Sequence, residues 1–174
     1  MSTITQKICL LGDFNVGKTS LVRRFIEDKF SDRYLSTVGV KVSRKSVNLT
    51  TEDVRQVNFL IWDLEGNTKF KSITPSYLKG ASGSIVVADL TRTETIENLN
   101  LHLQLFSEVN PQSKIIVALN KADLIPPEKL AKLVENFRSQ SSEAVVEIYT
   151  TSAKTGEYVN EMFQLMAQLL IANN

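Results

Sequence analysis

The feature that most constrains the fold of this chain is a short glycine-containing loop between an apolar segment and an amphipathic one. Residues 7–11 are mostly apolar and indicate a buried strand, and residues 18–26 place Leu21 and Phe25 on one face, which indicates a helix. The stretch between them, residues 12–19, reads Gly-Asp-Phe-Asn-Val-Gly-Lys-Thr and fits the pattern G-x-x-x-x-G-K-[ST]. Between a strand and a helix, that pattern is typical of a loop that binds the phosphates of a nucleotide.

The chemistry of such a loop comes from its backbone N–H groups, the N-terminus of the following helix, and two side chains. Lys18 supplies a cation for the β- and γ-phosphates, and the Thr19 hydroxyl can bind Mg²⁺. The alternative is a glycine turn that happens to precede lysine and threonine. The loop alone does not distinguish a GTPase from an ATPase or a small kinase. The residues that we expect to bind phosphate are Asn15, Val16, Gly17, Lys18, Thr19 and Ser20.

The rest of the chain alternates apolar runs with amphipathic segments, which predicts strands and helices in turn. Further strands are expected at residues 40–49, 56–62, 84–88, 114–119 and 145–149, and further helices at residues 93–109, 127–137 and 159–170. The first two of these strands form a hairpin, and the last three have the apolar character of parallel strands buried on both faces. We therefore predict one α/β domain over residues 1–174, with the P-loop NTPase fold of small G proteins. Its six-stranded, mainly parallel sheet has helices on both faces, and its ligand site lies at the carboxyl ends of the strands.

Two tetrapeptides at strand ends indicate which base is bound. Residues 120–123 read Asn-Lys-Ala-Asp, and residues 151–154 read Thr-Ser-Ala-Lys. The Asp123 carboxylate only accepts hydrogen bonds, which suits the two donors on the Watson–Crick edge of guanine, a pair that adenine lacks. Each tetrapeptide alone is also a plausible solvated turn, but together and in this order they favour guanine. The residues expected at the base are Asn120, Lys121, Asp123, Ser152, Ala153 and Lys154.

With these motifs in place, the chain from residue 7 to residue 170 resembles the Ras superfamily of small GTPases, and within it the Rab branch. Residues 62–81 look like a Rab second switch. The resemblance implies switch segments at residues 30–40 and 63–79. It also implies that Phe30 packs against guanine and that Tyr34 lies over the phosphates. It implies further that Thr37, Thr19 and Asp63 reach Mg²⁺, that the Gly66 N–H senses the γ-phosphate, and that Lys18, Thr37, Gly66 and Asn67 serve catalysis.

The second switch departs from the family, which usually has Asp-Thr-Ala-Gly-Gln where residues 63–67 read Asp-Leu-Glu-Gly-Asn. The family's glutamine orients the attacking water, and Asn67 is one C–C bond, about 1.5 Å, shorter, so we expect slow hydrolysis. Glu65 could repel the γ-phosphate, swing out to solvent, or meet Mg²⁺ or Lys18. Phe14 occupies a position where the family usually has a small residue, which puts standard activation by a partner's arginine in doubt.

These features predict a molecular switch that binds GTP or GDP with Mg²⁺, hydrolyses GTP slowly, and binds effector and regulatory proteins through its two switch segments. The alternative is a non-hydrolysing or GDP-locked adaptor, because of Glu65 and Asn67. A P-loop nucleotide kinase is disfavoured, because it needs an arginine-bearing lid and no inserted segment could build one.

Composition limits the setting in which the protein works. Its 20 basic and 19 acidic residues balance, so we expect no nucleic-acid partner. We also expect a monomer. The lone cysteine, Cys9, lies in an apolar run, which indicates inert core packing and a cytoplasmic location. We expect no membrane span and no direct membrane anchor, since the last residues include no cysteine for prenylation. The single histidine, His102, is expected at the surface without a chemical role.

Overall fold

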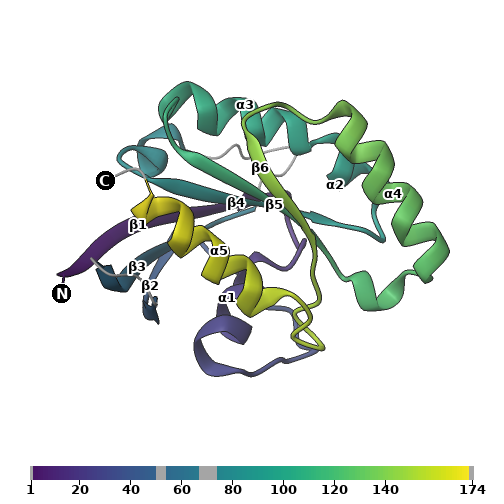
Figure 1. Cartoon of the computed structure of the whole chain (residues 1–174). Helices are drawn as coiled ribbons and strands as arrows, with labels where there is room; N and C mark the ends of the chain where they lie inside the picture. The colour runs from purple at the N-terminus through teal and green to yellow at the C-terminus, as the bar shows by residue number, and fades with distance from the viewer. Residues whose placement is uncertain (1, 50–53, 67–73, 173–174) are drawn as a thin grey trace.

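A computed structural model describes residues 2–49, 54–66 and 74–172, and these form a six-stranded sheet between two layers of helices (Figure 1). The strands are β1 (Ser2–Gly12), β2 (Val40–Asn48), β3 (Val54–Leu64), β4 (Gly83–Asp89), β5 (Lys114–Asn120) and β6 (Val145–Thr150). Their order is β2-β3-β1-β4-β5-β6, with β2 antiparallel to β3 and every other pair parallel. The predicted fold class is confirmed. The turn of the β2–β3 hairpin, residues 50–53, lies outside the described residues.

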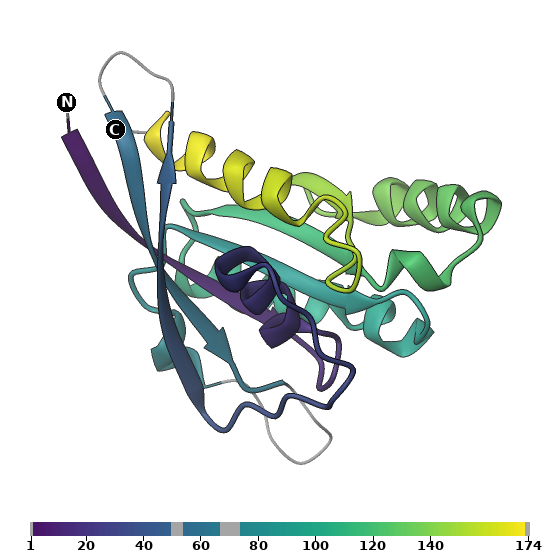
Figure 2. The same ribbon diagram turned by 90° about the horizontal axis from the view of Figure 1, so that it is seen from below.

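The helices lie on both faces of this sheet (Figures 1 and 2). The α-helices are α1 (Lys18–Glu27), α2 (Thr93–Glu97), α3 (Leu99–Val109), α4 (Pro127–Gln140) and α5 (Val159–Ile171), and two short 3-10 turns are η1 (Pro75–Leu78) and η2 (Ala122–Leu124). Helices α1 and α5 pack on one face, and α3 and α4 on the other. None of the helices in the described ranges has the length and apolar character needed to cross a bilayer.

The alternation of side chains along β1 divides the core into two halves. Ile8 and Leu10 point to the cluster under α1 and α5, while Cys9 and Leu11 point to the cluster under α3 and α4. All four are fully buried, as expected for a central strand of a parallel sheet. The first strand is therefore fixed from both sides, and so is the start of the loop that follows it.

The strands and helices differ from those predicted in three main respects. Strand β1 begins at Ser2 rather than at residue 7, because it continues its parallel pairing with β3 along a polar, partly exposed stretch. The single helix expected at residues 93–109 is two helices separated at Asn98. The prediction that residues 145–149 are buried on both faces is wrong, because β6 is an edge strand and Val146 is 44% exposed.

Candidate functional site

A cavity of about 480 Å³ lies at the carboxyl ends of β1, β3, β5 and β6. This is the edge at which ligands bind in parallel α/β sheets, and the volume suits a small organic ligand. The predicted residues that line it are Asn15, Gly17, Lys18, Thr19, Ser20, Phe30, Tyr34, Thr37, Gly66, Asn120, Lys121, Asp123, Ala153 and Lys154.

Four predicted residues do not line the cavity. Val16 is fully buried in the core beneath it. Asp63 and Ser152 are also buried, and each makes a hydrogen bond to a lining residue. Asn67 lies outside the described residues.

The phosphate loop, residues 12–19, is folded around the ammonium of Lys18. Its Nζ donates to the backbone carbonyls of Gly12, at 3.2 Å, and of Asp13, at 2.9 Å. Burial lowers the pKa of Lys18 to about 8, against the raising effect of the Asp63 and Asp13 carboxylates. A buried cation that donates to neutral carbonyls keeps charge available for an anion such as phosphate.

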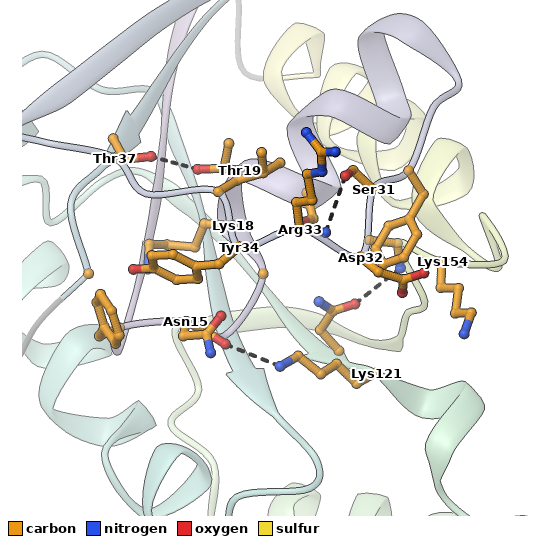
Figure 3. A pocket seen from close by; sticks show the side chains of 18 of the residues that line it. Asn15, Lys18, Thr19, Ser31, Asp32, Arg33, Tyr34, Thr37, Lys121 and Lys154 are labelled. Atoms are coloured by element: carbon orange, nitrogen blue, oxygen red, sulfur yellow. Dashed lines mark hydrogen bonds between the residues drawn. The ribbon is translucent and has the colours of Figure 1, made fainter.

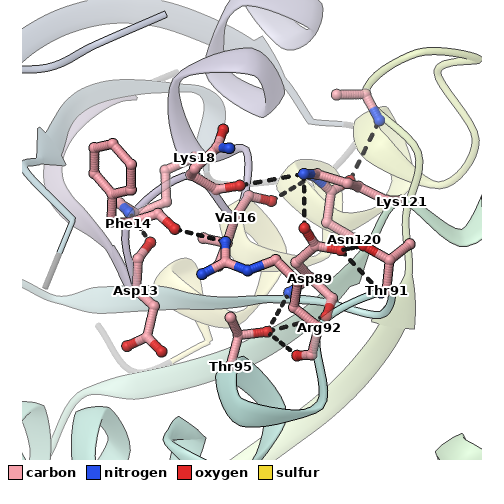
Figure 4. A network of polar contacts seen from close by, with 12 residues as sticks. Asp13, Phe14, Val16, Lys18, Asp89, Thr91, Arg92, Thr95, Asn120 and Lys121 are labelled. Atoms are coloured by element: carbon pink, nitrogen blue, oxygen red, sulfur yellow. Dashed lines mark hydrogen bonds and ion pairs between the residues drawn. The ribbon is translucent and has the colours of Figure 1, made fainter. Parts of the chain in front are cut away.

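The second glycine of the motif lets the base loops approach the phosphate loop. Gly17 has φ +102, and a Cβ there would lie 2.3 Å from Nδ2 of Asn120. That amide nitrogen donates to the Val16 carbonyl at 3.0 Å (Figure 4). Its Oδ1 accepts from the Thr151 hydroxyl at 3.2 Å and, more weakly, from the Ala153 N–H at 3.4 Å. Asn120, the first residue of one loop expected at the base, therefore connects the phosphate loop to the other, residues 151–154.

Three oxygens gather beside Lys18. The Thr19 hydroxyl donates to Oδ2 of Asp63 at 2.6 Å and lies 2.7 Å from the Thr37 hydroxyl, which it faces in Figure 3. Because the single Thr19 hydrogen goes to the carboxylate, Thr37 donates to Thr19. Burial raises the pKa of Asp63, opposed by its bond to Thr19 and by the charge of Lys18. Its other oxygen, Oδ1, is buried and has no hydrogen-bond partner among the residues that the structure describes. Such an oxygen set fits a hard divalent cation such as Mg²⁺.

At the far end of the cavity, Asp123 is exposed, and its Oδ1 accepts from the Ser152 hydroxyl at 2.7 Å. Lys121 reaches back to the phosphate loop, where its Nζ donates to the Asn15 carbonyl at 3.2 Å (Figure 3). The same ammonium lies 2.7 Å from Oδ2 of buried Asp89. No donor of the described residues is aligned for a hydrogen bond to that oxygen, so the contact is an ion pair without a hydrogen bond.

The switch segments meet above the phosphate loop. The rings of Phe14 and Tyr34 have centroids 5.3 Å apart, and both side chains are about half exposed. Glu65 accepts a hydrogen bond at Oε2 from the Gly39 N–H, and its own N–H donates to the Gly39 carbonyl, each at 2.8 Å. This joint between the two switches was not among the alternatives that the sequence suggested. A Cβ on Gly66 would lie 2.5 Å from the Cα of Phe14, so the second switch begins directly on the phosphate loop.

Two arginines that support the site were not predicted from the sequence, and one histidine lies elsewhere than predicted. Arg24 of α1 donates to the carbonyls of Ala153 and Lys154, at 2.8 and 2.6 Å. Arg92 donates to the Phe14 carbonyl at 2.8 Å (Figure 4). His102 is not at the surface, since it is 2% exposed and faces the phosphate loop. No local pattern marked these residues, because their partners are distant in sequence.

Comparison with known proteins agrees with this geometry. A family model described as the Ras of Complex, Roc, domain of DAPkinase matches residues 7–123. The chain is 37% identical to the GTP-binding protein ypt5 of Schizosaccharomyces pombe over 97% of its own length and 79% of that relative. It is 34% identical to the human Ras-related protein Rab-22A over 90% of its length and 79% of the relative, and 32% identical to the Ras-related protein SEC4 of Saccharomyces cerevisiae over 94% and 74%. The chain belongs to the Ras superfamily of small GTPases, and within it to the Rab-like proteins, which are GTP-binding molecular switches.

Proposed function

We propose that this chain, as a single G domain over residues 1–174, binds GTP and GDP with Mg²⁺, hydrolyses GTP slowly, and changes its partner binding when the γ-phosphate is lost. The observation that carries the proposal is the oxygen cluster of Thr19, Thr37 and Asp63 beside buried Lys18. Thr19 and Thr37 would bind the metal directly, and Asp63 would hold it through water. Because Thr37 belongs to the first switch, its contact would depend on the nucleotide state.

The chain's own groups would act on the γ-phosphate from several sides. Lys18 would hold the β- and γ-phosphate oxygens, and the Gly66 N–H would donate to the γ-phosphate. Magnesium, when bound, neutralises charge that develops on the phosphates. Asn67, shorter than the family's glutamine by one C–C bond of about 1.5 Å, would orient the attacking water less well, and a misplacement of about 1 Å costs on the order of a hundredfold in rate. A partner's arginine would have to displace the Phe14 and Tyr34 rings.

A second candidate function is a non-hydrolysing or GDP-locked adaptor. The specific observation in its favour is the Glu65 carboxylate, which ties the second switch to Gly39 of the first. A joint of this kind could hold both switches in one arrangement whichever nucleotide is bound. Multiple-turnover phosphate release separates the two candidates, because an adaptor releases none above the rate without protein.

The experiment that tests the proposed function is single-turnover GTP hydrolysis by the purified chain, with Mg²⁺ and with the metal chelated. We expect slow phosphate release that needs the metal and rises at least about tenfold in Asn67→Gln. The matched control is Asn100→Gln, the same change at an exposed position of α3, which leaves the rate unchanged. Equal rates in the wild type and in Asn67→Gln would refute the account of slow hydrolysis.

Effector and regulatory proteins would contact the switches, as Rab-type GTPases generally use such partners. Val38, Tyr34 and Val42 expose 82%, 52% and 48% of their surface along the first switch and the start of β2. We expect Val38→Asp to abolish capture of partners that prefer the chain loaded with a GTP analogue. The control Val146→Asp, on the edge strand β6, retains them; equal capture by both variants would argue against this surface.

A further inference from the structure

The phosphate loop is also contacted from the side away from the cavity. There, polar side chains of Arg92, Asn98 and α3 bond to Asp13 and Phe14 of the loop. Nδ2 of Asn98 donates to Oδ2 of Asp13 at 2.7 Å, and Nε2 of His102 lies 2.8 Å from Oδ1 of the same carboxylate. Arg92 holds the next carbonyl, that of Phe14, at 2.8 Å. The two oxygens of Asp13 are thus bonded by His102 of α3 and by Asn98, the residue that precedes this helix.

The contact between Asp13 and His102 is nearly sealed from water, because the two residues are 6% and 2% exposed. An ionised carboxylate can only accept, so the hydrogen must sit on Nε2 of the imidazole. Burial lowers the pKa of His102, against the raising effect of its bond to Asp13 and of that carboxylate's charge, while the Lys18 charge lowers it further. At neutral pH the ring is therefore an uncharged donor to a buried anion.

Asp13 links the His102 and Asn98 side chains to the phosphate site, because its side chain contacts one and its backbone contacts the other. Its side chain faces α3, whereas its backbone carbonyl accepts from Nζ of Lys18 at 2.9 Å. A change in the position of Asp13 would therefore move both the carbonyl beside Lys18 and the peptide groups that follow it in the loop.

We propose that His102 and Asn98 are positioning residues for nucleotide binding, which fix Asp13 so that the phosphate loop is in its binding shape before the nucleotide arrives. Fixing the loop beforehand lowers the ordering cost of binding, which strengthens affinity without any contact to the ligand. This inference rests on the proposed function only in that guanine nucleotide is the ligand of the loop.

The test is the dissociation rate of fluorescent GDP from the Mg²⁺-loaded chain. His102→Leu keeps the ring's approximate volume but removes the donor, and we expect about tenfold faster release, the size of a lost hydrogen bond to a buried charge. His102→Gln presents an amide donor at a similar reach and should restore release to within about twofold of the wild type. Leu103→Ala, a buried α3 position away from Asp13, should lower the melting temperature without speeding release.

The single histidine gives a second measurement that does not depend on a variant folding. Its ring nitrogen signals in the NMR spectrum should show hydrogen on Nε2 both with GDP bound and after GDP is removed, because the contact with Asp13 is in place before the nucleotide binds. Wild-type release in His102→Leu, failure of His102→Gln to rescue a fast His102→Leu, or a ring that carries its hydrogen on Nδ1 in the nucleotide-free chain would overturn the inference. A wild-type chain that binds no guanine nucleotide would instead refute the proposed function, and the inference with it.

Discussion

Replacing Glu65 with alanine should loosen the contact between the two switch segments. The carboxylate accepts the Gly39 N–H at 2.8 Å, and Glu65 is half-buried. A hydrogen bond to a charged group contributes about 1.5–3 kcal/mol when buried, and partial exposure reduces this to about 1 kcal/mol. That free energy corresponds to roughly a fivefold change in a local opening equilibrium. The neighbouring bond from the Glu65 N–H to the Gly39 carbonyl remains in the variant.

Amide hydrogen exchange of Gly39, followed by NMR in the GDP-bound protein, measures that opening directly. We expect about fivefold faster exchange in Glu65→Ala and a smaller change in Glu65→Gln, which keeps an acceptor oxygen. The described arrangement also keeps Thr37 against Thr19, so Glu65→Ala should weaken GTP relative to GDP by up to about fivefold. Unchanged exchange at Gly39 would refute the claim that the Glu65 side chain links the two switches through its bond to Gly39. Stronger relative GTP binding would indicate instead that Glu65 repels the γ-phosphate.

Three further predictions follow from the site and core. Gly66→Ala should weaken GTP binding about tenfold, because the added Cβ would lie 2.5 Å from the Phe14 Cα. Titration calorimetry measures the affinity, and an unchanged value would contradict the close approach of the two segments. The Lys18 pKa of about 8 should rise when a phosphate binds beside it, so GDP binding should take up more protons at about pH 8.5, where Lys18 is mostly neutral, than at about pH 7. Proton uptake makes the binding enthalpy at the higher pH differ between buffers, and equal enthalpies in all buffers would count against this prediction. Burial raises the pKa of Cys9 to about 12, so a thiol reagent at about pH 8 should modify it only after denaturation, and rapid labelling of the folded chain would argue against the buried strand.

The order of strands and helices could be predicted because each carries a local periodic signal. The apolar run that ends at Leu11 and the glycines and lysine that follow it locate the phosphate loop without reference to the rest of the chain. The polar first half of β1 gave no such signal, because its pairing with β3 rather than its burial makes it a strand. The break at Asn98 was also missed, because its side chain bonds to distant Asp13.

The same physical limit explains the misplaced His102. A single histidine on a helix gives no indication of its partner, and the carboxylate that holds it comes from the first loop of the chain. Arg24 is similar, because the carbonyls it holds belong to the loop of Ala153 and Lys154. Motifs therefore identified the groups expected at the ligand, while the side chains that hold those groups in place depend on tertiary contacts.

Base selection by Asp123 is the most direct test of the central claim that this cavity is a guanine-nucleotide site. Competition of GTP and ATP against fluorescent GDP should give a preference for GTP of about a thousandfold or more in the wild type, and the loss of most of it in Asp123→Ala. Equal affinity of the wild-type chain for the two triphosphates would contradict the account.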